Sequence, residues 1–208
     1  MSTYFFEFSV LATAHFLALL SPGPDFFLIT GNSIRKGFSG AAGLCIGIAA
    51  GNGVYIALSL TGFSLIKELP VLFQIIKSCG ALYLIYLGVI LLRSSKRSIC
   101  CKDVCGQKVQ SKSMFSQIGT GFMSAALNPK NTIFYLSLYM LMVSKSTPLY
   151  IQTLYGIWMM FLVLLWDLLI AWAIGSGTVK KTLNSWVHLI ERGSGLAMLC
   201  IGGGVLIT

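Results

Sequence analysis

Long apolar runs fill most of this chain, and only a few charged residues interrupt them. A helix needs about 20 predominantly apolar residues to cross a bilayer. Runs close to or above this length cover residues 4–31, 38–62, 69–92, 114–143, 149–174 and 186–208. The pattern therefore predicts an all-α polytopic membrane protein with six transmembrane helices.

The first and fourth runs are longer than one crossing needs, and each contains a proline break. The breaks are residues 21–25, Ser-Pro-Gly-Pro-Asp, and residues 127–131, Leu-Asn-Pro-Lys-Asn. Proline lacks a backbone N–H and clashes with the preceding helical turn, so the helix opens there. Opened backbone at membrane depth persists only where protein or water satisfies its polar groups. Two such breaks in corresponding positions predict a transporter's binding site.

Composition supports burial in lipid. The chain has 208 residues, of which 56% are hydrophobic and 10% are charged, and its mean hydropathy is +0.82. Soluble domains average roughly 25% charged residues, so a soluble protein this apolar would lack a polar surface. The N-terminal Met-Ser-Thr-Tyr carries no basic stretch, and no small-residue cleavage site follows. We therefore expect the first span to stay in the mature protein. We expect the protein to lie in the inner (plasma) membrane.

Basic residues gather in alternate loops. The odd-numbered loops carry Arg35, Lys36, Arg93, Lys96, Arg97, Lys102, Lys108, Lys112, Lys180 and Lys181, and the even-numbered loops carry only Lys67 and Lys145. The positive-inside rule then places the odd loops in the cytoplasm and both termini outside. The net charge of +9 is mostly a feature of this face. It favours anionic lipid headgroups as partners and not nucleic acid.

The third and sixth spans share one spacing, in which a basic residue precedes a glycine by three positions and another glycine follows eight later. The sets are Lys77, Gly80 and Gly88, and Arg192, Gly195 and Gly203. With the proline breaks, this spacing divides a single membrane domain, 1–208, into two three-helix repeats, 1–92 and 114–208, joined by a basic linker, 93–113. An odd number of spans per repeat makes the repeats inverted in the membrane.

Four segments resemble one family, in the same order along the whole chain. They are residues 21–25, 43–53 (Gly-Leu-Cys-Ile-Gly-Ile-Ala-Ala-Gly-Asn-Gly), 80–88 (Gly-Ala-Leu-Tyr-Leu-Ile-Tyr-Leu-Gly) and 121–130. The chain resembles the lysine-exporter (LysE-type) superfamily, in particular its homoserine/threonine-exporter branch. The resemblance implies proton-driven antiport of amino acids or similar small metabolites out of the cytoplasm, without a cofactor. It leaves the substrate open and does not require the cysteine-rich loop.

Two opposite charges follow the proline breaks, Asp25 and Lys130. A charge at the bilayer centre costs roughly 2.5–3.5 kcal/mol on insertion scales, so such a residue has a partner or a function. Inverted repeats would bring the breaks together near the midplane, where Asp25 can approach Lys130. The aspartate suits the ammonium of an amino acid, and the lysine or opened backbone N–H groups suit its carboxylate. A structural ion pair is the alternative.

The other predicted binding residues act through backbone geometry or hydrogen bonds. They are Pro22, Gly23, Pro24, Asn128 and Pro129, which open the backbone to a ligand, and Asn52. Asn52 contributes hydrogen bonds to the site or joins helices. Asp167 follows a long apolar stretch, where burial disfavours the charged form. It is therefore a candidate for proton coupling, together with Asp25.

Three further features have structural interpretations. His15 is expected to be a packed, hydrogen-bonded histidine, and Glu7 is expected at the interface near the outer end of the first span. Gly43, Gly47 and Gly51 recur every four residues and let two helices of the molecule approach closely.

Other functions make different demands on the sequence. A thiol–disulfide electron carrier of this architecture needs a cysteine in each broken helix, and residues 4–30 and 114–143 contain none. Heavy-metal efflux needs thiolates or paired carboxylates in the core, whereas Asp25 would oppose Lys130. Metal binding by Cys100, Cys101 and Cys105 is disfavoured because no second Cys/His set accompanies them. No phosphate-binding loop is present. We expect a transporter and not an enzyme, and a homodimer is compatible with the small size.

Overall fold

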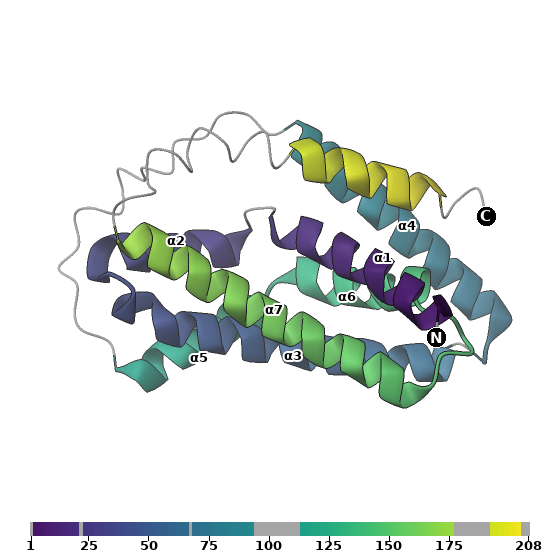
Figure 1. Ribbon diagram of the computed structural model, residues 1–208, viewed down its shortest axis with the longest axis horizontal. Helices are drawn as coiled ribbons and strands as arrows, with labels where there is room; N and C mark the ends of the chain where they lie inside the picture. The colour runs from purple at the N-terminus through teal and green to yellow at the C-terminus, as the bar shows by residue number, and fades with distance from the viewer. Residues whose placement is uncertain (1, 21–22, 67, 94–112, 177–191, 205–208) are drawn as a thin grey trace.

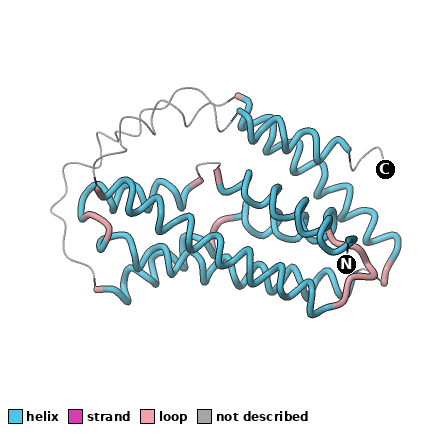
Figure 2. The backbone as a smooth tube through the Cα atoms, in the orientation of Figure 1, coloured by secondary structure: helices cyan, strands magenta, loops and turns pink. Residues whose placement is uncertain are grey.

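The computed structural model describes residues 2–20, 23–66, 68–93, 113–176 and 192–204. These residues are helical, with short connections and no strand among them (Figure 2). The helices are α1 (Ser2–Leu19), α2 (Pro24–Lys36), α3 (Ser39–Ile66), α4 (Pro70–Leu92), α5 (Met114–Ala126), α6 (Pro129–Met142) and α7 (Leu149–Gly175). A last helical stretch covers residues 192–204. The predicted all-helical fold is confirmed for this part of the chain.

Proline and glycine mark several helix ends. Pro24, Pro70 and Pro129 are the first residues of α2, α4 and α6. Proline suits this position because its fixed φ is helical and its missing N–H would have no helical partner there. Gly37 ends α2 with a φ of 70°, and its N–H donates to the Ser33 carbonyl over 2.9 Å. The break positions are therefore helix starts.

Three helices are long and apolar enough to cross a membrane: α3, α4 and α7. Residues Thr3–Leu19 of α1 and α2 together pass the same test as one span bent by 54°, and α6 contains a shorter apolar helix, Ile133–Met142. The described residues thus contain three or four clear spans. The protein is a multi-pass membrane protein, and its six predicted spans remain an expectation.

The helices form one bundle whose connections lie at its two ends (Figure 1). One end of the bundle holds the C-terminal ends of α2 and α7 and the N-terminal ends of α3 and α5. α1 begins at the opposite end, where α6 also connects to α7. The 192–204 helix lies beside α4 and finishes towards the end at which α1 begins. The basic pair Arg35 and Lys36 in the last turn of α2 belongs to the first end.

α3 and α5 form the closest helix pair in the bundle. A methyl group added at Gly47 would collide with the backbone of Ile118 and Phe122, and one added at Gly121 would collide with the backbone of Leu44. The small residues allow the two backbones to touch. The predicted packing role of the glycine face on α3 is therefore confirmed.

α4 and the 192–204 helix meet in the same way. A methyl group added at Gly88 would lie 2.8 Å from the Gly195 carbonyl oxygen, and one added at Gly195 would lie 2.7 Å from the Gly88 carbonyl oxygen. Two glycines from the repeated spacing therefore contact each other. The third and sixth predicted spans are direct neighbours.

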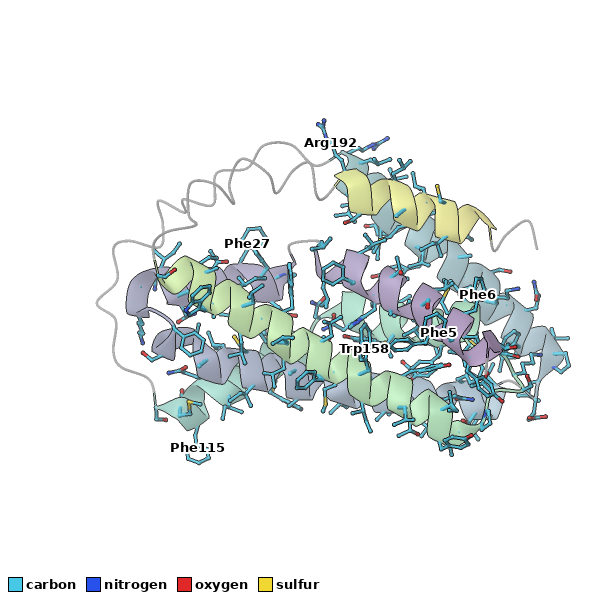
Figure 3. All side chains as sticks on the ribbon, viewed as in Figure 1. Phe5, Phe6, Phe27, Phe115, Trp158 and Arg192 are labelled. Atoms are coloured by element: carbon cyan, nitrogen blue, oxygen red, sulfur yellow. The ribbon has the colours of Figure 1, made fainter. Side chains whose placement is uncertain are left out.

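Many large apolar side chains face away from the bundle. Phe5, Phe6 and Phe115 are 73%, 70% and 86% exposed, and Figure 3 shows Phe27 and Phe115 projecting from opposite sides. Exposure of large aromatic rings to water would be unfavourable. A lipid environment around the bundle removes this cost.

Inside the bundle the apolar side chains form two clusters. The first includes Leu11, Phe63, Leu84, Tyr139 and Met159, and the second includes Ile29, Cys45, Ile48, Val163 and Ile170. The second cluster joins α2, α3, α5 and α7. The candidate site lies where the clusters meet.

Candidate functional site

A cavity of about 70 Å³ opens between the two apolar clusters. Water needs roughly 10–15 Å³ of such volume per molecule, so the cavity holds several waters or a small solute. Its described lining residues are His15, Ala18, Leu19, Gly23, Asp25, Phe26, Ile48, Asn52, Asn128, Asn131, Phe134, Tyr135, Val163, Trp166, Asp167 and Ile170. The lining comes from α1, α2, α3, α6 and α7 and from the connection between α5 and α6.

Two residues from the second half of the chain donate hydrogen bonds to Asp25. Its Oδ1 accepts a hydrogen bond of 2.6 Å from the Ser124 hydroxyl, and its Oδ2 accepts one of 3.5 Å from Asn128 Nδ2. Asp25 lies in the first turn of α2, where the partial positive charge of the helix end stabilises a carboxylate. The carboxylate is thereby fixed at the cavity without being fully buried.

The opening between α5 and α6 has its carbonyl groups satisfied. The Ala125 carbonyl accepts hydrogen bonds of 3.2 Å from the Asn131 side chain and from the Asn128 N–H. The Ala126 carbonyl accepts a hydrogen bond from the Tyr55 hydroxyl of α3. Opened backbone in lipid requires such partners. Asn131 and Tyr55 therefore make this break tolerable inside the bundle.

Tyr135 of α6 connects three helices through its hydroxyl. It donates to Asn52 Oδ1 of α3 over 3.0 Å, and it lies 3.5 Å from His15 Nε2 of α1. The Asn52 amide nitrogen donates in turn to the Ile48 carbonyl over 2.9 Å. All three side chains are buried. They form a polar wall of the cavity.

Asp167 of α7 is the second carboxylate of the cavity. It is 7% exposed, and its Oδ2 has no hydrogen-bond partner among the described residues. It is close enough to Asp25 for the two charges to interact. A buried carboxylate without full hydrogen bonding is costly when ionised. Such a group is suited to taking up and releasing a proton.

The structure brings most of the predicted site residues to one place. Gly23, Asp25, Asn52, Asn128 and Asp167 all line the cavity. Pro24 and Pro129 begin the helices that border it. Pro22 lies outside the described residues, as do the side chains of Pro129 and Lys130. The ion pair between Asp25 and Lys130 therefore stays a prediction.

The sequence did not predict three of the lining residues, Asn131, Phe134 and Tyr135, or the Asp25 partner Ser124. The sequence predicts a packed, hydrogen-bonded His15, and this residue is 0% exposed with Tyr135 beside it, but it also lines the cavity. Asn131 is the last residue of the second break and Ser124 precedes that break by three positions, and this is the one signal that the sequence offers.

Glu7 lies near the start of α1, and its place at the membrane interface stays a prediction. Its side chain is 8% exposed and accepts a hydrogen bond of 2.8 Å from the Thr147 hydroxyl, in the connection between α6 and α7. The Gln152 side chain donates to the Thr147 carbonyl over 2.7 Å. Glu7 is therefore buried because a polar cluster covers it at the end of the bundle opposite Arg35 and Lys36.

Thiol and metal-binding groups do not gather in the described part of the chain. No three His, Cys, Asp or Glu residues are placed there to hold a metal ion. Of its cysteines, Cys45 is buried, whereas Cys79 and Cys200 are exposed. Cys100, Cys101 and Cys105 lie outside the described residues.

Residues 16–208 match the LysE type translocator family. The chain belongs to this family. Its members are transporters and not enzymes, so the resemblance carried by the proline breaks and the glycine segments is confirmed. The matched range includes both breaks and every predicted binding residue. His15 precedes it by one residue.

Individual relatives cover about two thirds of the chain. The chain is 31% identical over 140 residues to the threonine efflux protein of Escherichia coli K12, across 67% of this chain and 68% of the relative. It is 31% identical over 144 residues to the threonine efflux protein of Salmonella typhi, with the same shares. The leucine efflux protein of Salmonella choleraesuis is 30% identical over 142 residues, which are 66% of this chain and 63% of that protein. No solved structure matches the chain.

Proposed function

We propose that this chain exports neutral amino acids, or related small metabolites, from the cytoplasm. The observation that carries the proposal is the cavity inside a LysE type translocator, with the carboxylates of Asp25 and Asp167 in its wall. The efflux proteins for threonine and leucine among its relatives support an amino-acid substrate.

The substrate's ammonium group binds Asp25. Ser124 and Asn128 orient the carboxylate, so it meets the incoming cation in one geometry. Positioned charge-assisted hydrogen bonds of this kind are the strong ones. The Asn131 side chain donates a hydrogen bond to the Ala125 carbonyl. This bond stabilises the open backbone between α5 and α6.

The substrate's carboxylate binds at the helix starts beside the breaks. Gly23 precedes α2 and has no side chain to cap its first N–H groups, and Asn128 precedes α6. Helix N-termini attract anions through free N–H groups and the helix dipole. Lys130, the second residue of α6, adds its positive charge on this side. In the empty site it pairs with Asp25.

Asp167 couples transport to protons. Its unpartnered oxygen and its proximity to Asp25 mean that a proton on one carboxylate favours charge on the other. Binding of the ammonium at Asp25 and protonation at Asp167 therefore influence each other. Proton-coupled antiport needs such a link.

Alternating access follows from two inverted repeats, 1–92 and 114–208, joined by the linker 93–113. With six spans, the positive-inside rule predicts that the bundle end with Arg35 and Lys36 faces the cytoplasm and that both termini lie outside. The breaks that follow α1 and α5 then flank the cavity near the midplane, and rocking of the repeats opens it to each side in turn. A homodimer in the lipid bilayer is compatible with this arrangement.

Counterflow in proteoliposomes tests the proposal. Purified protein is reconstituted and loaded with an unlabelled amino acid, and uptake of labelled amino acids is followed across a panel of neutral, basic and acidic substrates. We expect accumulation of neutral amino acids above protein-free liposomes. Absence of counterflow for the whole panel would overturn the proposal.

A further inference from the structure

Two hydrogen bonds join the first two turns of α1 to the second half of the chain. The Thr147 hydroxyl, in the connection between α6 and α7, donates to Glu7 Oε2 over 2.8 Å, across 140 positions of sequence. The Tyr155 hydroxyl of α7 donates to the Tyr4 carbonyl over 2.9 Å. α1 begins at the end of the bundle where α6 connects to α7 (Figure 1). Both bonds therefore lie at that end, and both would break if α1 moved away from α7.

The connection that carries Thr147 is fixed by bonds that do not involve α1. The Thr147 N–H donates to the Ser144 carbonyl over 3.1 Å, and the Thr147 carbonyl accepts a hydrogen bond of 2.7 Å from the Gln152 side chain. The Tyr139 hydroxyl of α6 donates to the Gln152 carbonyl over 3.0 Å. Thr147 and Gln152 are 2% and 1% exposed. Movement of α1 would therefore break the bond to Glu7 and leave the connection intact.

An apolar layer separates this contact from the cavity. The Phe8 ring of α1 lies 5.6 Å from the ring of Tyr155 and 5.0 Å from that of Trp158, centre to centre. The Trp158 ring lies 6.1 Å from that of His15, which lines the cavity. Leu11 of α1 belongs to the same apolar cluster and is 0% exposed. Packed side chains leave few voids larger than a water molecule, so this layer closes the cavity towards the end at which α1 begins.

A hydrogen bond to a carboxylate suits a contact that forms and breaks repeatedly. In the closed arrangement Glu7 is 8% exposed, and the Thr147 hydroxyl supplies a partner that a buried carboxylate needs. When α1 moves away, water replaces the hydroxyl as the partner of the carboxylate. The bond therefore adds a modest preference for the closed arrangement without making it permanent.

We propose that Glu7 and Thr147 form a gate, whose hydrogen bond holds the cavity closed at the end where α1 begins and breaks before substrate leaves there. The inference rests on the proposed function, and it adds the residues whose contact controls one of the two openings. The positive-inside rule predicts that this end faces outside, so the gate opens for release of the exported solute. Removing the bond shifts the population towards the form that is open at this end.

Accessibility of the cavity from each side of the membrane tests the gate. Ala18 lines the cavity, so Ala18→Cys places a thiol in its wall. Labelling of this thiol by a charged methanethiosulfonate reagent, which does not cross the bilayer, is measured in right-side-out and in inverted membrane vesicles. Protein with the native Ala18 reports the labelling of the natural cysteines, which is subtracted.

In this background Thr147→Val should raise labelling from the outside by about tenfold, the factor that corresponds to loss of a hydrogen bond to a charged group. Labelling from the inside should not rise, because alternating access opens one end at a time. Thr147→Ser keeps the hydroxyl and should label like the parent. Thr153→Val is the matched control, because the Thr153 hydroxyl donates within α7 to the Leu149 carbonyl, and it should also label like the parent.

Glu7→Gln provides a second variant that tests the same bond. Its amide oxygen still accepts from Thr147, but a neutral acceptor bonds roughly half as strongly, so labelling from the outside should rise by about threefold. Combined with Thr147→Val it should add nothing to the effect of Thr147→Val alone, because both changes remove one interaction. If Thr147→Val fails to insert, Glu7→Gln still decides, and an unchanged rate in it overturns the gate.

The outcomes separate the gate from the exporter proposal. Equal rises from both sides would mean general loosening of the bundle and would overturn the gate, as would unchanged labelling from the outside. If either occurs while counterflow proceeds, the exporter proposal stands. If counterflow is absent for the whole panel of amino acids but labelling of Thr147→Val rises from the outside only, the exporter proposal fails and the role of this bond in closing the cavity stands.

Discussion

The Ser124 hydroxyl donates a 2.6 Å hydrogen bond to the Asp25 carboxylate and so joins α5 to α2 across 99 positions of sequence. This contact couples the two halves of the chain at the cavity. Because Asp25 is only partly buried, its carboxylate stays available to a ligand. Ser124 is therefore placed to orient the carboxylate that we propose binds the substrate's ammonium.

Ser124→Ala should weaken substrate binding by about tenfold while leaving the maximal rate within about twofold. A hydrogen bond to a charged group is worth about 1.5–3 kcal/mol, and its lower bound corresponds to roughly that factor. Without the hydroxyl, Asp25 adopts several orientations. The half-saturating concentration in counterflow measures the effect. Ser124→Thr keeps a hydroxyl and should remain close to wild type; equal losses in both variants would contradict the orienting role.

Asp25→Asn should abolish efflux without loss of membrane insertion, because a neutral amide cannot balance the substrate's ammonium. Labelled-substrate efflux and the amount of protein in isolated membranes together check this outcome. Glu68→Gln, at an exposed position outside the cavity, serves as the control for loss of one negative charge. Wild-type transport by Asp25→Asn would rule out its binding role.

The predicted pair of Asp25 and Lys130 has its own test. Lys130→Met should also abolish efflux, since the carboxylate of the substrate loses a positive partner. Asp25→Lys combined with Lys130→Asp should restore folding better than either single exchange. Thermal unfolding of the purified variants measures this. Equal instability of the double and single exchanges would argue against direct pairing.

Asp167→Asn should uncouple amino-acid export from proton movement. The asparagine side chain has nearly the size and polarity of aspartate but cannot take up and release a proton. Counterflow should therefore continue, whereas an imposed proton gradient should no longer drive accumulation. The two assays on the same proteoliposomes separate coupling from binding. If the gradient accelerates the variant as much as the wild type, another group carries the proton.

Gly47→Ala should destabilise the protein by about 1–3 kcal/mol, the usual cost of overpacking. The added methyl group would collide with the backbone of Ile118, which cannot move aside as a side chain can. The midpoint of thermal unfolding in detergent measures the loss. Gly119→Ala in α5 is the matched control, because a methyl group there meets nothing within 4 Å. A similar shift in both variants would contradict close packing of α3 on α5.

Several features of the fold were predictable from local sequence. The runs 69–92 and 149–174 correspond closely to α4 (Pro70–Leu92) and α7 (Leu149–Gly175). Lipid exposure demands uninterrupted apolar side chains, so a span is visible in a single window of the chain. Pro24 and Pro129 begin helices for an equally local reason, since proline cannot continue the helix before it.

Partners of the site residues could not be predicted in this way. Tyr135 contacts Asn52 across 83 positions and His15 across 120. Nothing in the apolar neighbourhood of His15 distinguishes a cavity-lining histidine from a packed one. Glu7 shows the same limit, because its hydrogen-bond partner Thr147 lies 140 positions away along the chain.

By itself the sequence determined the membrane class, the helical fold class and the prolines at which α2 and α6 begin, because these depend on neighbouring residues and on the apolar solvent. The tertiary structure alone decided which carbonyls, hydroxyls and carboxylates meet at the cavity. That choice depends on how closely the helices approach, through glycine contacts such as Gly47 with Ile118. Buried polar groups must find partners wherever this packing places them.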